Sequence, residues 1–142
     1  MGKRSTSRKL AMQALYEFEI RAKDEQEIIK CTLNKDSYIE ETKKFCSEIF
    51  WGVLENQNFI DSLIKKHAID WKFERIAGID KVILRVGIWE LILTETSTKI
   101  IISEMIELIR KYSMFEAIKF VNGLLGVVAV KRKELTKKCL PE

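Results

Sequence analysis

The sequence contains few residues that interrupt helices. It has one proline, Pro141, and six glycines in 142 residues. Their scarcity argues against a turn-rich β architecture, while abundant Leu, Ile, Lys and Glu favour helices. No apolar run reaches the roughly 20 residues that span a bilayer, and the basic residues 1–9 precede a broken apolar pattern, unlike a signal peptide. These absences predict an all-α protein without a membrane span.

Residue types used for catalysis and metal binding are also scarce. The three cysteines, Cys31, Cys46 and Cys139, are odd in number and widely separated, which fits neither a disulfide framework nor a zinc site and indicates a reducing cytoplasm. The one histidine, His67, has no cysteine or carboxylate cluster at metal-ligand spacing. Neither the G-x-x-x-x-G-K-[ST] phosphate loop nor G-x-G-x-x-G occurs. We therefore predict no catalysis, no cofactor and no metal, a buried Cys46, and a solvated or helix-end His67.

One stretch formally matches a nucleotide-binding loop. Residues 123–126, Gly-Leu-Leu-Gly, have the GXXG pattern of KH domains, but the two leucines belong to an apolar helical pattern and no strands are predicted around them. Glycine inside a helix costs roughly 1 kcal/mol relative to alanine, so a close neighbour is a reasonable motive for it. We interpret this stretch as a site of close helix packing, with close approach of RNA as the alternative.

What the sequence does contain is a set of amphipathic helical patterns. With 46% hydrophobic and 32% charged residues, the chain predicts one domain over residues 1–142 with about seven helices. Ser37 and Ser113 each precede a glutamate by three positions and are expected to open helices as capping boxes, and Asp80 is expected to be an N-cap. The helix over residues 80–94 is apolar around so much of its circumference that we expect it to be the central one. The expected ranges are 6–21, 25–30, 37–67 with an interruption near 56–58, 73–77, 80–94, 99–112, and a last helix from 113 that dissolves into a basic tail.

The net charge of +4 is unevenly distributed. Residues 1–10 contain four basic residues and no acid, and residues 131–142 contain five basic residues against two acids, which leaves an excess of acid in between. The pattern indicates contact with a polyanion at the ends, unless both ends are only solvated tails. Arg4, Arg8 and Lys9 oppose the macrodipole at the start of the first helix, and a bound phosphate would relieve this.

Three stretches resemble one family in order along the chain. They are residues 4–16, RSTSRKLAMQALY; residues 75–76 with 80–85, DKVILR, and 89–91, WEL; and residues 102–108, ISEMIEL, leading to 119–123, KFVNG. These are similar to the bacterial transcription antitermination factor family NusB. The resemblance implies an all-helical fold of two packed helical subdomains and binding of the boxA element of leader RNA. It also implies a heterodimer with the ribosomal protein NusE, acting with transcribing RNA polymerase and other Nus factors; whether the chain forms a homodimer is left open.

The resemblance also implies which residues act. The RNA-binding residues are expected at the first helix and near the last: Arg4, Arg8, Lys9, Gln13, Lys119, Phe120 and Asn122. Lysine and arginine attract phosphates, Phe120 offers a stacking face, and Asn122 or Gln13 can read base edges. Core packing of Phe120 and simple surface polarity of Asn122 are the alternatives. Tyr16 and Asp80 are expected near the partner surface, although Tyr16 equally fits a buried tyrosine and Asp80 a helix cap.

The sequence departs from the family pattern at two places. The family has Val-Pro where this chain has Ser97-Thr98, and Asn-Glu-Ala where it has Ser103-Glu104-Met105. The fold tolerates both changes, but a polar role at Ser103 is in doubt. Two rival functions stay open: the NusB-like RNA-binding part of an RNA cytosine methyltransferase, whose catalytic part and nucleophilic cysteine motif this chain lacks, and a protein-protein adaptor without an RNA role.

Overall fold

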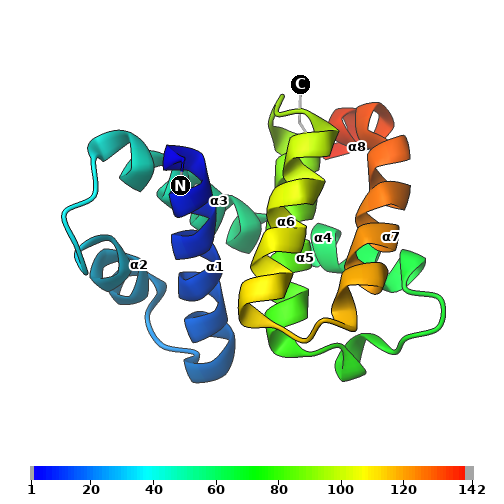
Figure 1. Cartoon of the computed structure of the whole chain (residues 1–142), viewed down its shortest axis with the longest axis horizontal. Helices are drawn as coiled ribbons and strands as arrows, with labels where there is room; N and C mark the ends of the chain where they lie inside the picture. Colours follow the sequence, from blue (N-terminus) through cyan, green and yellow to red (C-terminus); the bar gives the residue numbers. More distant parts are fainter. Residues whose placement is uncertain (1, 140–142) are drawn as a thin grey trace. The chain divides into compact units, whose positions relative to one another are not determined.

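The computed structural model describes residues 2–139, and every regular element within that range is a helix (Figure 1). The all-helical prediction is confirmed, with eight α-helices in the described range where about seven were expected. None of these helices is long and apolar enough to cross a membrane. The elements are α1 (Lys3–Arg21), α2 (Glu25–Leu33), α3 (Glu40–Glu55), α4 (Gln57–His67), the 3-10 helix η1 (Phe73–Arg75), α5 (Gly78–Leu93), α6 (Thr98–Tyr112), α7 (Ala117–Val130) and α8 (Arg132–Cys139).

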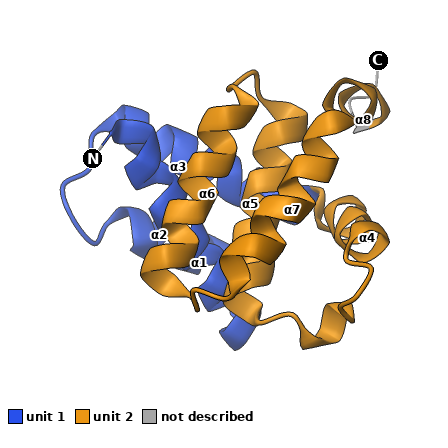
Figure 2. Ribbon diagram, turned by 45° about the vertical axis from the view of Figure 1, so that its right-hand side comes forward, with its two compact units in different colours: residues 1–55 blue, residues 56–142 orange. Residues whose placement is uncertain are grey.

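The chain divides into two compact units at the interruption that the sequence predicted near Asn56. Unit 1 comprises residues 1–55 and unit 2 residues 56–142 (Figure 2). Unit 1 contains α1, α2 and α3, and unit 2 contains α4 to α8. Each unit has its own set of packed helices and is described by itself below.

In unit 1, α1 packs along α3 and against α2. The buried side chains include Leu10 and Leu15 of α1 and Phe45 of α3. The buried Ser7 hydroxyl joins the two helices by donating to the carbonyl oxygen of Thr42 at 2.8 Å. Cys46 is fully buried, as predicted, and burial raises the pKa of its thiol to about 12. This thiol is therefore protonated and part of the core at physiological pH.

The end of α1 lies at the only non-glycine residue with a positive φ in the described range. Ala22 has φ 48° and donates its backbone N–H to the carbonyl oxygen of Phe18. This is the left-handed cap that usually takes glycine. The start of α1 lies at Lys3, three residues before the predicted one, with no side chain capping it.

In unit 2, α5 is the central helix, as predicted. Every residue from Val82 to Ile92 is buried, and α5 packs against α4, α6, α7 and α8. Gly87 allows this close packing, because a Cβ there would lie 2.9 Å from Cγ of Met105 on α6 and 3.1 Å from a methyl carbon of Leu125 on α7. The central helix α5 therefore packs directly against α6 and α7 at Gly87.

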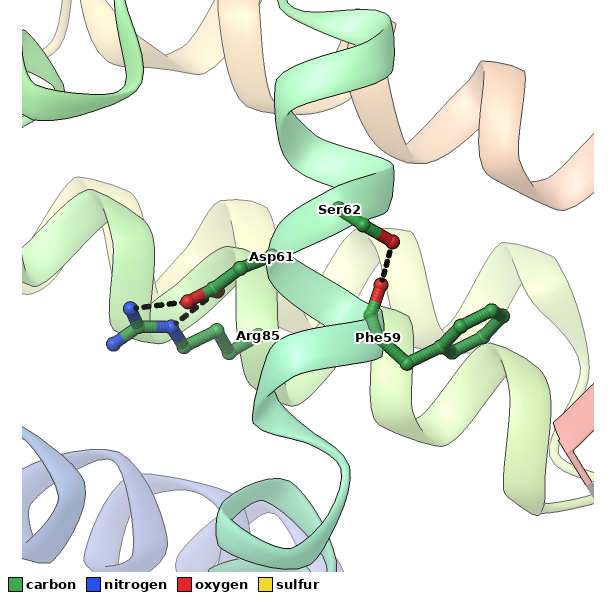
Figure 3. Close-up of polar contacts among 4 residues, drawn as sticks. All are labelled: Phe59, Asp61, Ser62 and Arg85. Atoms are coloured by element: carbon green, nitrogen blue, oxygen red, sulfur yellow. Dashed lines mark hydrogen bonds and ion pairs between the residues drawn. The ribbon is translucent and has the colours of Figure 1, made fainter.

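Two arginines fix α5 to its neighbours. Arg85 makes a bidentate ion pair with Asp61 of α4, Nε to Oδ1 at 2.8 Å and Nη2 to Oδ2 at 3.0 Å (Figure 3). Both side chains are largely buried, so removing either partner would leave a buried charge and destabilise the fold by about 3–5 kcal/mol. The Ser62 hydroxyl in the same view donates only within α4, to the carbonyl of Phe59.

At the C-terminal end of α5, Arg132 satisfies the last carbonyls. It donates to the carbonyl oxygens of Leu91 at 2.6 Å and Thr94 at 2.8 Å, which lack partners within the helix. Residues 132–139 form α8 and pack on α5. The prediction that the last helix dissolves into a basic tail at this point is therefore wrong for the described residues, and residues 140–142 of that predicted tail lie outside them.

Three predicted helix caps are wrong. α3 begins at Glu40, so Ser37 lies three residues before it, and α7 begins at Ala117, after Ser113. Ser113 instead ends α6, and its hydroxyl donates to Oδ1 of Asp80 at 2.5 Å. Asp80 lies inside the first turn of α5, which begins at Gly78, and is not its N-cap. The local sequence patterns predicted that these hydroxyl and carboxylate groups cap helix ends. At Ser113 and Asp80 the two side chains instead hydrogen-bond to each other.

Candidate nucleic-acid interface

The start of α1 presents two arginines over one aromatic ring. Arg4 and Arg8 lie one turn apart, with their guanidinium carbons 4.2 Å and 5.6 Å from the ring centroid of Phe45 on α3. The first turn of α1 contains no acidic residue. Lys3 beside them pairs with Glu41 at 3.1 Å, in an exposed contact that adds little stability. The helix start thus presents one exposed arginine, Arg4, over a ring that α3 supplies.

The two arginines differ in exposure. Arg4 is exposed, whereas only 3% of Arg8 is accessible to solvent. We expected the basic residues to precede the packed part of the helix, and for Arg8 this is wrong. The aliphatic stem and planar guanidinium of arginine can cover an aromatic ring, which lets a cation occupy a packed position. Arg8 is therefore a structural residue of unit 1 as well as a candidate phosphate contact.

The other predicted residues of α1 share one side of the helix. Lys9, Gln13 and Tyr16 follow one another at spacings of four and three residues, and all three are half-buried. The residues predicted to contact RNA and the one predicted to contact the protein partner therefore lie on the same face of α1. Tyr16 is neither fully buried nor fully exposed.

On α7, the predicted residues surround an aromatic pair that the sequence did not reveal. Lys119 and Asn122 are exposed and Phe120 is half-buried. The ring of Phe120 lies 5.5 Å from that of Trp71, with 48° between the ring planes. Trp71 comes from the connection between α4 and η1, which brings two segments far apart in sequence together. We call Trp71 and Phe120 the aromatic pair.

Two hollows adjoin the aromatic pair. One, of about 340 Å³, is lined by both aromatic residues with Arg75, Ile76, Asp80 and Met114 among others. The second, of about 250 Å³, is lined by both aromatic residues with His67, Ile69, Asp70 and Gly123 among others. The structure therefore places Asp80, predicted for partner binding, and Phe120, predicted for RNA binding, at one hollow.

Two ionisable groups at these hollows have shifted pKa values. Burial raises the pKa of Asp80, and the hydrogen bond from Ser113 opposes that rise. Burial, followed by the charges of Lys131 and Lys66, lowers the pKa of His67. His67 ends α4, as its helix-end interpretation required, and its Nε2 has no hydrogen-bond partner among the described residues. The lowered pKa favours the uncharged imidazole.

The glycines of α7 do not mark close helix packing. A Cβ built at Gly123 or Gly126 would meet no atom within 4 Å outside the helix itself. The predicted reason for these glycines is therefore wrong, because the core side of α7 is occupied by Val121, Leu124, Leu125 and Val128 instead. The other reason that the sequence suggested for these glycines is close approach of RNA.

Among the described residues no group of His, Cys, Asp and Glu could hold a metal ion.

Comparisons with known proteins agree on one family. Residues 5–129 match the model of the NusB family. The transcription antitermination protein NusB of Bacillus subtilis is 36% identical over 125 residues, which cover 87% of this chain and 92% of that one. The crystal structure of T. maritima NusB has a TM-score of 0.85 at 28% identity and covers 94% of this chain and 96% of that chain. A crystal structure of the antitermination factors NusB and NusE in complex with double-stranded RNA has a TM-score of 0.83 at 25% identity, over 90% of this chain and 96% of that one.

Proposed function

This chain belongs to the NusB family, and we propose that it is a transcription antitermination factor that binds boxA-containing RNA together with the ribosomal protein NusE. It acts as a non-catalytic RNA-binding domain in the cytoplasm, as part of an assembly with transcribing RNA polymerase and other Nus factors. The solved complex of NusB and NusE with RNA, whose NusB fold this chain shares, supports both partners.

The observation that carries the proposal is the cationic start of α1. Arg4 is exposed and lies over Phe45, and the first turn of α1 contains no acidic residue. A helix start normally prefers acids, so a cluster of cations there indicates an external anion. The RNA backbone supplies such anions, and each phosphate that is neutralised releases counterions.

A second candidate RNA-binding region, within unit 2, supplies base selectivity. Phe120 has one side against Trp71 and lines both hollows, and Asn122 is exposed two positions further along α7. We assign base stacking to Phe120, base-edge recognition to Asn122 and Gln13, and phosphate contacts to Lys9 and Lys119. Tyr16 and Asp80 are assigned to the NusE surface.

The test measures binding of labelled boxA RNA and a scrambled RNA of equal length by electrophoretic shift, with and without NusE. We expect tighter binding of boxA than of the scrambled RNA, and a larger preference when NusE is present. Equal binding of both RNAs in the presence of NusE would contradict the antitermination function. Binding of NusE without any RNA binding would favour the adaptor function.

A further inference from the structure

The aromatic pair is unusual because one of its rings stays largely open to water. Trp71 is 55% exposed although it contacts Phe120, and both residues belong to unit 2. A large aromatic side chain left in contact with water is a candidate binding residue when it adjoins a concave surface. Here it adjoins two such surfaces, because Trp71 and Phe120 line both hollows.

The second hollow is kept open by a glycine. Gly123 lines the 250 Å³ hollow one turn after Phe120, and a Cβ at this position would meet nothing within 4 Å. Almost any other residue at this exposed position would make α7 more stable. The absence of a side chain at Gly123 therefore leaves space beside the aromatic pair and serves no contact within the fold. A planar ligand such as a nucleotide base needs such space in order to stack on an aromatic ring.

The polar groups around the hollows match the edges and backbone of a nucleotide. Polar residues line both hollows: Arg75 and Asp80 in the first, and His67 and Asp70 in the second. Arg75 lines the first hollow with the aromatic pair, and the exposed Lys72 and Lys119 are the sequence neighbours of Trp71 and Phe120. Aromatic rings together with cations are the combination that binds unstacked bases and the phosphates between them.

We propose that Trp71 and Phe120 form a two-sided stacking platform, with unstacked bases of single-stranded RNA received in the two hollows and Gly123 giving the base access to the second. This inference rests on the proposed function and extends it to Trp71, Gly123 and a defined pair of base sites. An apolar side chain of a protein partner is the competing occupant, but it would make no use of the Arg75 guanidinium that lines the first hollow.

Four variants test the platform by fluorescence anisotropy with labelled boxA RNA. Trp71→Ala should weaken binding about 5- to 150-fold, the equivalent of the roughly 1–3 kcal/mol that stacking contributes per base, while Trp71→Phe keeps most of the affinity. Gly123→Leu should weaken binding although it leaves the melting temperature unchanged or raised. Its matched control is Gly126→Leu, at a second open glycine that lines neither hollow, which should bind normally.

A second control uses an exposed aromatic residue outside the pair. Phe115 is 76% exposed and lines neither hollow, so Phe115→Ala should leave RNA affinity unchanged. RNA carrying 2-aminopurine at single positions should show quenching on binding to the wild type, and at least one quenched position should lose its quenching in Trp71→Ala. Quenching that is unchanged at every position in that variant would overturn the platform even if its affinity fell.

The outcomes separate the platform from the proposed function. If the wild type binds no RNA, the proposed function fails first. If the wild type prefers boxA while Trp71→Ala and Gly123→Leu bind it equally well, the platform is wrong and the proposed function stands. If Trp71→Ala weakens binding of NusE and leaves binding of RNA alone intact, the hollows receive protein and the platform is likewise wrong.

Discussion

The start of α1 and the outer face of α7 both carry candidate RNA-binding residues, but these residues differ in how far they take part in the packing of the fold. At α1, the cation Arg8 is nearly inaccessible and lies over Phe45, so a candidate RNA contact is also part of the packing of unit 1. At α7, Lys119 and Asn122 are exposed and the glycines face open space, while the core residues occupy the other side of the helix. Binding and folding are therefore coupled at α1 and separable at α7.

Among the variants that test this comparison, the largest change in stability is expected between the glycines of α5 and α7. Gly87→Ala would place a Cβ 2.9 Å from Met105 and 3.1 Å from Leu125, and should lower the free energy of unfolding by about 1–3 kcal/mol through overpacking. Gly126→Ala should raise it by roughly 0.5–1 kcal/mol, because alanine favours the helix and meets nothing. Urea denaturation measures both. Equal changes in the two variants would mean that α7 is not open on its outer face.

The coupling at α1 is tested by comparing its two arginines. Arg8→Ala should lower the free energy of unfolding by about 1–2 kcal/mol, because it removes the buried stem and the guanidinium that lies over Phe45. Arg4→Ala, at an exposed position, should lower it by less than about 1 kcal/mol. Both should weaken RNA binding. If Arg8→Ala unfolds at the same urea concentration as the wild type, Arg8 is not part of the packing.

The smallest expected effect concerns the pH dependence of stability at Asp80. Its pKa in the folded protein lies above the ordinary value of 3.8, so the folded state binds its proton more tightly than the unfolded state does. The stability contributed by the protonated carboxyl is fully present below pH 3.8 and declines as pH rises through the raised pKa. Asn at this position still accepts from Ser113 but does not titrate.

The measurement is the free energy of unfolding of the wild type minus that of Asp80→Asn, followed upward from about pH 3, below the ordinary carboxyl pKa. We expect this difference to fall as pH rises and then to level off. A difference that increases with pH would show that the carboxylate is stabilised in the fold and that its pKa is lowered.

Much of the fold followed from periodicity, and the failures have a common physical cause. The central helix α5 was recognisable because apolar residues cover its whole circumference, and the burial of Cys46 followed from its place on an apolar stripe. The true roles of Ser113 and Asp80 could not be predicted, because their side chains hydrogen-bond to each other across the contact between α5 and the end of α6. Helix α8 was missed because its position is set by contacts with α5, through the hydrogen bonds of Arg132 and Thr136, and by burial of Leu135.

The candidate site was recognised in part. The basic residues of α1 stood out as cations at a helix start, but nothing in the sequence distinguished exposed Arg4 from buried Arg8. Trp71 was missed because its partner Phe120 is far away in the chain. The one local signal was that each aromatic residue neighbours a lysine, which is too common a pattern to identify a site by itself.

The central claim is that RNA binding has a charge component at α1 and a selectivity component at α7. The most direct test is the salt dependence of boxA and scrambled RNA binding for the wild type, Arg4→Ala with Lys9→Ala, Phe120→Ala and Asn122→Ala. We expect the basic variant to reduce the log-log salt slope by about 0.7 for each phosphate that is no longer neutralised, equally for both RNAs. Phe120→Ala and Asn122→Ala should keep the slope and lose preference for boxA. Folded Phe120→Ala and Asn122→Ala variants that retain full boxA preference would contradict the account.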